Sequence, residues 1–486
     1  MTDTISTTAP VTTGLYIGGQ ERAGTDVLEV VDPARPGVVV GTAAAASKED
    51  VADAVAAAKA AFPAWSKLSA AERAAQMAAA IEGIAEDRDE DARVLSLENG
   101  KIRMESWIDA LVFEIRWQLA LSLADEVEQT KVLPPAPGIP VETTVAYQPI
   151  GVVTVIVPFN WPIAILAAAL PHALLAGNTA IVKPPPSTPL ATTRLVQRVA
   201  EKLPPGVLNV VTGDRSTGAA LIEHPTPAMV SITGSVRAGM QVAEAAARDV
   251  KRVHLELGGK APVVVFDDAD LAAAAEAIAV AGYFNAGQDC TAATRVLAGP
   301  GIHDDFVAAL AEQARSTKVG RPDDPDALLG PVNNANQLGR VSGFLDRLPD
   351  HASVAAGGSR AEDLGDGYFW QPTVVSGLHQ DDEAVQDEIF GPVITVQRFS
   401  DEAQALAWAN GVRYGLASSV WTKDFGRAMR MSRSLDFGCV WINTHIPLVA
   451  EMPHGGFKHS GYGKDLSMYG FEDYTRVKHV MANLES

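Results

Sequence analysis

Apolar and polar positions alternate along the chain in blocks that predict strands and helices in turn. The run VVTVIV at 152–157 is continuous and mostly β-branched, which is typical of a strand buried on both faces. Similar apolar runs follow in TAIVK, VLNVVTG, AMVSITG and VHLEL. Between them lie stretches with helical spacing that begin near Thr188, Thr217 and Ser235. This alternation predicts a doubly wound parallel sheet.

The alternation starts again after Gly259 and predicts a second α/β domain. It opens with the strand pattern APVVVF, continues with a helix over residues 268–286 and a strand near Thr294, and extends to about Asn443. Upstream of the first sheet, residues 48–85 predict two or three helices. The fold class we expect is therefore α/β, with two doubly wound domains.

Three further patterns bear on domain organisation. A helix is expected over residues 106–129, and it ends at the Pro/Gly-rich loop VLPPAPGIP, which indicates a boundary. The strand patterns ETTVAYQP at 142–149 and YTRVKHVMA at 474–482 have no obvious local partner. We expect the second to pair with the first, or with the sheet edge of a neighbouring subunit.

The composition narrows the class of protein and its partners. The chain has 486 residues and a net charge of −20, which argues against nucleic acid and anionic membranes as partners. Two cysteines allow no disulfide framework, so we expect a cytoplasmic protein. The first residues, MTDTISTTAPVTT, do not resemble a signal peptide. The longest apolar run, from Ile163, is interrupted by Pro171 and is shorter than the ~18 residues that a membrane span needs, so we expect no membrane partner.

The motif NAGQDCTAATR contains the first candidate for catalysis, Cys290. A lone cysteine is more often a small buried hydrophobe than a nucleophile. Here the neighbours Gln288, Asp289 and Thr291 are polar, which argues against a purely apolar site. A thiol with a base or a positive charge nearby becomes a nucleophile. The other cysteine, Cys439, lies in the apolar stretch FGCVWIN and is expected to be structural.

Two polar residues at strand ends are the next candidates. Glu256 follows apolar residues in HLELGGK, where it is either an ordinary strand-end carboxylate or a desolvated general base. Asn160 lies between two prolines in PFNWP, directly after the VVTVIV strand. It is either a turn residue or an amide that can stabilise a developing oxyanion. None of the histidines shows metal-ligand spacing, so we expect no metal.

Two glycine-containing turns follow strands and open predicted helices. This is the geometry in which backbone N–H groups and the helix dipole bind phosphate. Neither turn is the GxGxxG dinucleotide fingerprint, so each indicates only a candidate phosphate loop. Their residues are Gly213 and Gly218 in TGDRSTG, and Thr233, Gly234, Ser235 and Gly239 in TGSVRAG.

Taken together, PFNWP, LELGGK, GQDC and EIFGP, in this order and separation, resemble the aldehyde dehydrogenase superfamily from about Tyr16 to the C-terminus. The resemblance implies oxidation of a small-molecule aldehyde, with Cys290 as nucleophile, Glu256 as general base, and Asn160 with the Cys290 N–H as oxyanion hole. It also implies a homodimer or homotetramer. The implied domains are an NAD(P)-binding domain at 1–126 and 148–258, a catalytic domain at 259–443, and a small β oligomerisation element with the C-terminal segment at 127–147 and 444–486.

The same resemblance implies a cofactor site. Glu388 and Phe390 of EIFGP would hold the nicotinamide ribose and ring, Lys183 the adenine ribose, and Trp161 and Ser235 would lie along the diphosphate. Two positions depart from the family pattern. Many NAD-preferring relatives have Glu three residues after the ribose-binding Lys, where this chain has Pro186, so NAD is expected but NADP is not excluded. The family also commonly has Lys nine residues after the oxyanion Asn, with roles in ribose contact and proton relay, and this chain has Ala169 there.

The C-terminal half is most similar to 4-aminobutyraldehyde dehydrogenases, with betaine aldehyde dehydrogenases next. The segments that carry this similarity include FDDADL, ASSVWTKD and NTHIPLVAEMPHGG. A cationic aldehyde would favour carboxylates and aromatic faces near its ammonium group. The alternative for the helix acids is a solvated helix face. The candidate substrate residues are Asp109, Glu114, Trp117, Asp289 and Trp441.

Other functions stay open at this point: an aliphatic or aromatic aldehyde as substrate, a CoA-acylating enzyme, a cofactor-independent cysteine hydrolase, or a catalytically silent scaffold. The presence of Glu256 weighs against the CoA-acylating enzyme, because transfer to CoA can dispense with a base for hydrolysis. A hydrolase would leave Glu388 and Lys183 without a purpose. A silent scaffold is disfavoured because both nucleophile and base are present.

Overall fold

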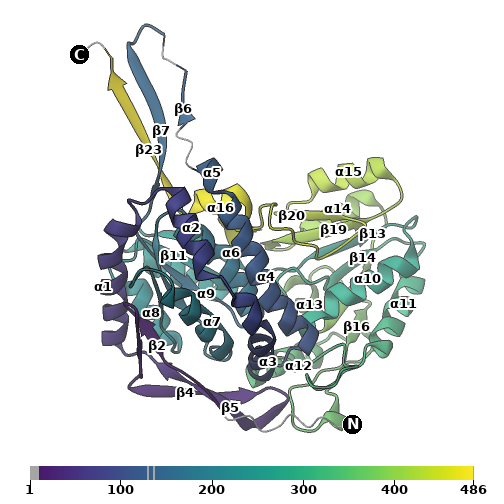
Figure 1. Cartoon of the computed structure of the whole chain (residues 1–486). Helices are drawn as coiled ribbons and strands as arrows, with labels where there is room; N and C mark the ends of the chain where they lie inside the picture. The colour runs from purple at the N-terminus through teal and green to yellow at the C-terminus, as the bar shows by residue number, and fades with distance from the viewer. Residues whose placement is uncertain (1–9, 128–130, 135–136, 485–486) are drawn as a thin grey trace.

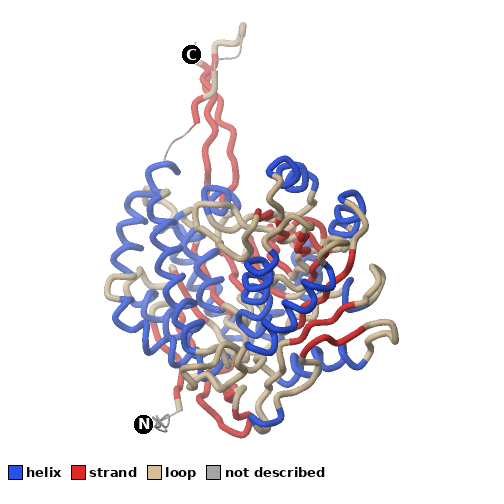
Figure 2. Tube along the Cα trace, turned by 90° about the vertical axis from the view of Figure 1, so that its right-hand side faces the viewer, coloured by secondary structure: helices blue, strands red, loops and turns tan. Residues whose placement is uncertain are grey.

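The chain folds into two α/β lobes and a β arm that projects from them (Figure 1). This computed structural model describes residues 10–127, 131–134 and 137–484. The view turned by 90° shows the arm standing clear of the body (Figure 2). Residues 1–9, which form most of the segment MTDTISTTAPVTT used for the signal-peptide expectation, lie outside the described residues, as does the predicted helix end at Gln129.

The first lobe is built on an eight-stranded sheet whose five central strands are parallel. Antiparallel strands complete both edges. The doubly wound sheet predicted from the alternating pattern is thereby confirmed. In spatial order its strands are β22 (Gly461–Tyr462), β12 (Arg252–Leu257), β11 (Met229–Gly234), β8 (Val152–Ile156), β9 (Thr179–Lys183), β10 (Leu208–Val210), β2 (Leu15–Ile17) and β3 (Gln20–Arg22).

Helices pack on this sheet and enclose its main hydrophobic core. Capping boxes start the first two, because the side chains of Ser47 and Ser69 each accept a hydrogen bond from the backbone of the third helical residue. The helices are α1 (Lys48–Trp65), α2 (Ala70–Ala80), α3 (Arg88–Asn99), α4 (Arg103–Ser122), α5 (Ala124–Val127), α6 (Pro162–Leu175), α7 (Leu190–Glu201), α8 (Arg215–Glu223), α9 (Val236–Ala247) and α16 (Ser467–Asp473). A small sheet of β1 (Val11–Thr13), β5 (Arg35–Ala45) and β4 (Asp26–Asp32) lies at the base.

Helix α6 accounts for the long apolar run seen in the sequence. Nearly every one of its residues is buried, and a helix that is apolar on all sides belongs inside a protein or a membrane. In the part of the chain that the structure describes, no helix combines the length and apolarity needed to span a membrane. The helix instead packs against α4 and starts at Pro162, two residues after Asn160.

The second lobe contains a seven-stranded sheet that is parallel except at the β15 edge. Its strands, in spatial order, are β15 (Ser353–Ala356), β16 (Thr373–Ser376), β17 (Val393–Arg398), β14 (Arg295–Ala298), β13 (Pro262–Val265), β19 (Ala417–Trp421) and β20 (Cys439–Ile442). Its helices are α10 (Leu271–Tyr283), α11 (His303–Ser316), α12 (Ala335–Asp346), α13 (Glu383–Gln386), α14 (Glu402–Asn410) and α15 (Phe425–Ser434). A two-stranded sheet pairs β18 (Tyr414–Gly415) with β21 (Phe457–Lys458).

The arm pairs the two strand patterns that lacked a local partner. β23 (Thr475–Asn483) runs antiparallel to β7 (Val141–Pro149) over its full length, and β6 (Lys131–Val132) adds to the other side of β7. Of the two alternatives, pairing within the chain is therefore confirmed. The domain boundaries stay a prediction, and the structure adds that β22, from the predicted C-terminal segment, joins the first sheet.

Candidate active site

The predicted polar residues lie at the carboxyl ends of neighbouring parallel strands. Lys183 is the last residue of β9, Glu256 lies near the end of β12, and Asn160 follows β8. The register pairs Thr233 of β11 directly with Glu256. Because parallel strands end at the same edge of a sheet, this is the edge where α/β proteins bind ligands.

Cys290 reaches this edge on a loop with unusual backbone geometry. Asn285, Ala286 and Gly287 have φ angles of 53°, 55° and 67°, a left-handed conformation that is rare for alanine. Two contacts hold it: the Asn285 N–H donates to Glu105 Oε1 at 2.6 Å, and Asn285 Nδ2 donates to the Asn160 carbonyl at 3.0 Å. Backbone strain of this kind is found at functional sites. The nucleophile loop is thus tied directly to the Asn160 loop.

The two glycines of LELGGK are required by what lies next to them. A Cβ atom at Gly259 would lie 2.2 Å from the Cys290 carbonyl oxygen, and one at Gly258 would lie 2.3 Å from Glu388 Oε2. The Gly259 N–H also donates to Glu388 Oε1 at 2.8 Å. Only glycine permits this approach. Strand β12 therefore brings the nucleophile loop and Glu388 together beside Glu256.

Burial and neighbouring carboxylates set the protonation states at this edge. Burial raises the pKa of the Cys290 thiol well above its usual value, and Asp289, Glu256 and Glu388 raise it further. Burial, followed by the Asp465 charge, raises the pKa of Glu256 well above that of an ordinary carboxyl. Cys290 is therefore a neutral thiol at rest, and Glu256 binds a proton more readily than an ordinary carboxylate does. A base with a raised pKa suits proton transfer near neutral pH.

The predicted cofactor residues lie along the same strand ends. Lys183 is almost completely buried; burial lowers its pKa to about 8, and its Nζ donates to the Pro184 carbonyl at 3.0 Å. A Cβ at Gly218, in α8, would lie 3.9 Å from the Lys183 side chain. Exposed Ser235 caps α9 by accepting from the Ala238 N–H at 3.2 Å, so the amino end of α9 opens to solvent.

The other predicted cofactor residues are placed by their backbones. Gly213 follows β10, where a Cβ would lie 2.0 Å from Thr217 Oγ1, and Gly234 ends β11. Phe390, with a φ of 61°, places its ring edge-on to Phe159 at 5.9 Å between centroids. EIFGP in the second lobe therefore faces PFNWP in the first.

Two predicted substrate residues require correction, because they lie in the core. Asp109 is completely buried: its Oδ2 accepts from Lys101 Nζ at 2.8 Å, and its Oδ1 accepts from the Ala164 N–H at 2.6 Å. Trp117 is also fully buried, and its indole donates to the Met77 carbonyl at 3.2 Å. Neither group is free to bind a substrate.

Glu114 differs from expectation, whereas the cofactor role of Trp161 stays a prediction. Glu114 pairs with Arg88 at a partly exposed position, which fits the solvated helix face better than a pocket. The Trp161 indole, which we expected along the diphosphate, donates to Asp289 Oδ2 at 2.8 Å, and Lys101 Nζ lies 3.3 Å above its ring. Its side chain therefore connects the buried Lys101–Asp109 pair to the residue before Cys290.

The last two substrate candidates do lie beside the nucleophile loop. Asp289 accepts from the Thr291 N–H at 2.7 Å as well as from Trp161, so it fixes the loop conformation. Trp441 packs against His445 with 4.7 Å between ring centroids, and His445 Nε2 is 2.7 Å from the Thr291 carbonyl. Asp289 therefore belongs to the nucleophile loop, and Trp441 is linked to that loop through His445.

We expect Asp109→Ala to destabilise the protein by about 3–5 kcal/mol, because it leaves the Lys101 ammonium buried and unpaired. Urea denaturation followed by circular dichroism checks this through the shift of the unfolding midpoint. Glu114→Ala, which removes a partly exposed ion pair with Arg88, is the matched control and should cost no more than about 1 kcal/mol. Equal shifts for the two variants would contradict the prediction. Lys101→Met with Asp109→Leu should restore most of the loss.

Sequence reasoning missed three residues of this site. Glu105 and Asn285 hold the left-handed loop, as described above. Arg116 Nη1 donates to the Ala164 carbonyl at 2.6 Å, and its charge faces Asp465, Asp109, Cys290 and Asp289. Glu105 lies four residues before Asp109 and shares the buried face of α4, whereas the position of Arg116 carries no signal that separates it from a surface charge. The position of Asn285 within NAGQDC was the available signal.

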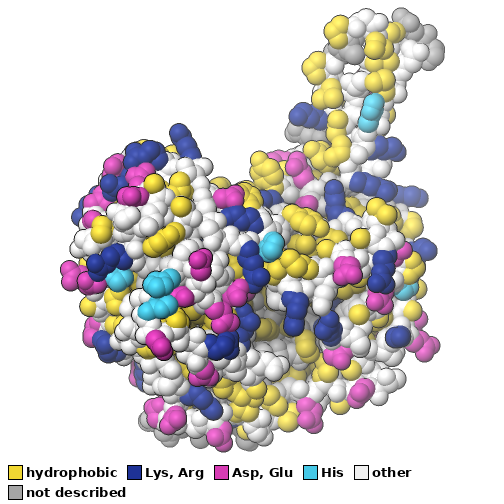
Figure 3. Space-filling model, turned by 180° about the vertical axis from the view of Figure 1, so that it is seen from behind, with side chains coloured by type: hydrophobic (Ala, Val, Ile, Leu, Met, Phe, Trp, Pro, Cys, Tyr) yellow, Lys and Arg dark blue, Asp and Glu magenta, His cyan; other side chains and the backbone are white. Residues whose placement is uncertain are grey.

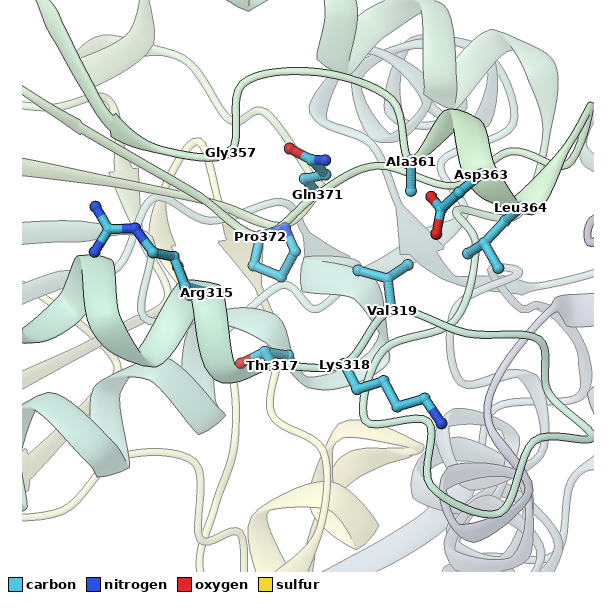
Figure 4. Close-up of a pocket in the computed structure, with 11 residues that line it drawn as sticks. Arg315, Thr317, Lys318, Val319, Gly357, Ala361, Asp363, Leu364, Gln371 and Pro372 are labelled. Atoms are coloured by element: carbon cyan, nitrogen blue, oxygen red, sulfur yellow. The ribbon is translucent and has the colours of Figure 1, made fainter.

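Two other features of the described residues lie outside these contacts. A surface hollow of about 370 Å³ between α11 and β16 contains none of the predicted site residues (Figure 4), and its Lys318 is paired with Asp324 at 2.8 Å. His351, His379 and Asp382 place three ligand-type atoms within 4.8 Å of one another. His351 already bonds Asp382 at 2.9 Å, and both histidines are exposed, so we assign no metal to them.

Comparison with known proteins agrees with this geometry. The sequence model of the aldehyde dehydrogenase family matches residues 20–480. The chain is 38% identical over 451 residues to betaine aldehyde dehydrogenase of Bacillus subtilis, covering 91% of this chain and 92% of that one. It is 37% identical to an aldehyde dehydrogenase of Emericella nidulans, covering 96% and 94%. The crystal structure of Staphylococcus aureus betaine aldehyde dehydrogenase in complex with NAD⁺ superposes with a TM-score of 0.94 at 34% identity, covering 98% and 96%.

Proposed function

We propose, from the premise that this chain belongs to the aldehyde dehydrogenase family, that it oxidises a small cationic aldehyde to the carboxylic acid, with betaine aldehyde as the first candidate. The enzyme class follows from the family: an NAD(P)-dependent aldehyde dehydrogenase. The observation that carries the substrate class is the set of carboxylates around Cys290. Asp289, Glu256 and Glu388 all raise the pKa of its thiol, so the local field favours a positive charge.

The arrangement of side chains supports a two-stage mechanism. Cys290 must lose its proton to attack the carbonyl carbon, and any of the carboxylates that face it, Asp289, Glu256 or Glu388, would accept that proton. The Asn160 amide and the Cys290 N–H would stabilise the oxyanion of the thiohemiacetal. After oxidation, Glu256 would take a proton from the water that hydrolyses the Cys290 thioester.

The residues present also fit a nicotinamide dinucleotide, which supplies the hydride acceptor when it is bound. Lys183 is a buried ammonium at a strand end, where a ribose hydroxyl would find a donor. The exposed amino end of α9 offers backbone N–H groups of the kind that bind phosphate. Burial raises the pKa of Glu388 to about 7, and the Gly259 N–H fixes its orientation towards the nucleophile loop.

Pro186→Glu should lower kcat/KM with NADP at least tenfold relative to NAD, a difference of about 1.4 kcal/mol. Pro186 is exposed three residues beyond Lys183, so a carboxylate there would repel a 2′-phosphate. Initial rates with both cofactors check this at constant ionic strength. Ser187→Glu adds the same charge one residue further on and is the control. A similar change in both variants would attribute the effect to net charge alone.

The aminoaldehyde is the second candidate, favoured by the C-terminal segments that resemble 4-aminobutyraldehyde dehydrogenases. Both candidates carry a positive charge, and they differ in the length of the chain and in the methyl groups on nitrogen. Trp441 offers an aromatic surface near the nucleophile loop that suits a quaternary ammonium group. The relatives named above also favour betaine aldehyde.

The test is NADH formation by purified enzyme with four aldehydes. They are betaine aldehyde, its neutral isostere 3,3-dimethylbutanal, 4-aminobutyraldehyde and the anionic succinic semialdehyde. We expect kcat/KM for betaine aldehyde to exceed that for the neutral isostere by tenfold or more. Equal values for these two would overturn the cationic substrate and leave the dehydrogenase intact. Turnover only after CoA is added would favour the acylating alternative.

The arm is the proposed assembly surface for a homodimer or homotetramer. The view from behind shows hydrophobic side chains along it (Figure 3). Exposed apolar residues on a projecting strand pair mark an interaction surface. On the arm they are Val132, Leu133, Ile139, Tyr147, Val477, Val480, Met481 and Leu484.

A further inference from the structure

A cluster of buried titratable side chains lies next to Glu256, outside the contacts used so far. His254 and Glu256 are two residues apart on β12 and so point to the same face of the sheet. His454 and Asp465 come from the C-terminal segment, where their backbones exchange two hydrogen bonds of 2.9 and 2.7 Å. Asp473, the last residue of α16, completes the cluster.

The side chains make two separate sets of contacts, which the backbone pairing of His454 with Asp465 brings together. Glu256 Oε2 lies 3.8 Å from His454 Nε2, and His254 Nε2 lies 3.2 Å from Asp465 Oδ1. His254 Nδ1 is bonded to Asp473 Oδ2. The first four side chains are at most 11% exposed, whereas that of Asp473 is 23% exposed. Asp473 also lines an open surface hollow of about 430 Å³, so the cluster extends from Glu256 to the protein surface.

Two polar atoms of this cluster lack a hydrogen-bond partner in the described chain. They are Glu256 Oε1 and His454 Nδ1, and both are buried. An unpaired buried polar atom costs on the order of 1–3 kcal/mol. A concentration of such atoms beside a catalytic base requires a reason, of which proton transfer directly or through one water molecule is the simplest.

Burial keeps His454 neutral and able to transfer protons. It faces Glu256, Asp465, Asp289, Arg116 and Lys464, and burial lowers its pKa to about 4. His254 differs: burial opposes its charge, but Asp465 and Asp473 together raise its pKa well above the usual value. The cluster therefore joins a neutral imidazole beside Glu256 to a charged one between two carboxylates.

We propose that His454 relays protons between Glu256 and Asp465 and so returns the general base to its active form after each hydrolysis. A proton leaves the Glu256 carboxyl for His454 Nε2, while a second leaves Nδ1 for a water molecule and passes from it to the Asp465 carboxylate. The ring ends neutral in its other tautomer, and proton exchange with water returns it to the first before the next cycle. At the position where the family commonly has lysine, this chain has Ala169, which is buried and cannot exchange protons. This proposal rests on the proposed function, and it assigns His454 a role through Glu256 rather than on the substrate.

The test compares His454→Gln with His172→Gln by pre-steady-state kinetics with betaine aldehyde and NAD. His172 is a matched control, because it is also fully buried and burial lowers its pKa to about 4. It faces Asp465 as well, but within the described residues it makes no contact with Glu256. His454→Gln should keep a full NADH burst, which reports intact folding and acylation, and lose steady-state turnover on the order of tenfold, below the 10²–10⁴ expected of a general base itself. His172→Gln should lose neither.

Imidazole rescue separates a relay from a structural role. Added imidazole should restore turnover in His454→Ala and leave wild-type enzyme unchanged. Unchanged turnover in His454→Gln, or an equal loss in both glutamine variants, would overturn the relay. A wild-type enzyme that produces no burst with any aldehyde would instead overturn the proposed function.

Discussion

Cys290→Ala is expected to abolish NADH formation, with a loss of at least about 10⁴-fold in kcat. The reason is chemical: without the sulfur no thiohemiacetal forms, and the residues around it cannot supply a replacement nucleophile. The carboxylates that face Cys290 accept protons, and Asn160 donates hydrogen bonds. Removing the nucleophile therefore removes the first covalent step and every step after it.

The chain offers a matched control, because Cys439 is its other cysteine. Cys439 lies on β20, and burial raises its pKa to about 11. Cys439→Ala should retain most of the activity, and cofactor binding measured by tryptophan fluorescence should be unchanged in both variants. Substantial turnover in Cys290→Ala would contradict the mechanism. Loss of turnover in Cys439→Ala alone would show that Cys439, and not Cys290, is the nucleophile.

The strand framework was predictable because its signal is local. The β-branched runs of β8, β9 and β11 are buried on both faces, and each is followed by a turn and a helix start in the sequence. Parallel strands then bring Asn160, Lys183 and Glu256 to one edge without further assumptions. Position along a strand was therefore enough to bring these residues together.

The helix α4 shows where local patterns were insufficient. Asp109, Phe113 and Trp117 are spaced by four residues, so they share one face of the helix, and that face is buried. This spacing was the signal that Asp109 belongs to the core, and its partner Lys101, eight residues earlier, could not be identified from the sequence. The left-handed geometry at Ala286 likewise depends on contacts with Glu105 and Asn160 that only the tertiary fold creates.

Glu256→Gln is expected to separate the two halves of the reaction. Glutamine keeps the size of the side chain and cannot accept the proton of the hydrolytic water, so thioester hydrolysis should slow by roughly 10²–10⁴-fold. A burst of NADH, up to one per active site, should precede the slow phase. Hydroxylamine, which cleaves thioesters without a base, should restore turnover.

The pH dependence gives the same residue an independent signature. Burial and Asp465 raise the pKa of Glu256, and the base is active only when deprotonated. Steady-state turnover should therefore rise with pH through a value above the ordinary carboxyl range and fall as pH decreases below it, and Glu256→Gln should remove this limb. Glu98→Gln is the control, because burial also raises the pKa of Glu98, to about 8. Within the described residues, its carboxylate accepts hydrogen bonds from the backbone N–H groups of Leu190 and Ala191 at the amino end of α7. If turnover of Glu256→Gln still rises with pH in the same way, another group governs hydrolysis. If both variants lose turnover to a similar extent, the buried carboxyls are needed for stability rather than for proton transfer.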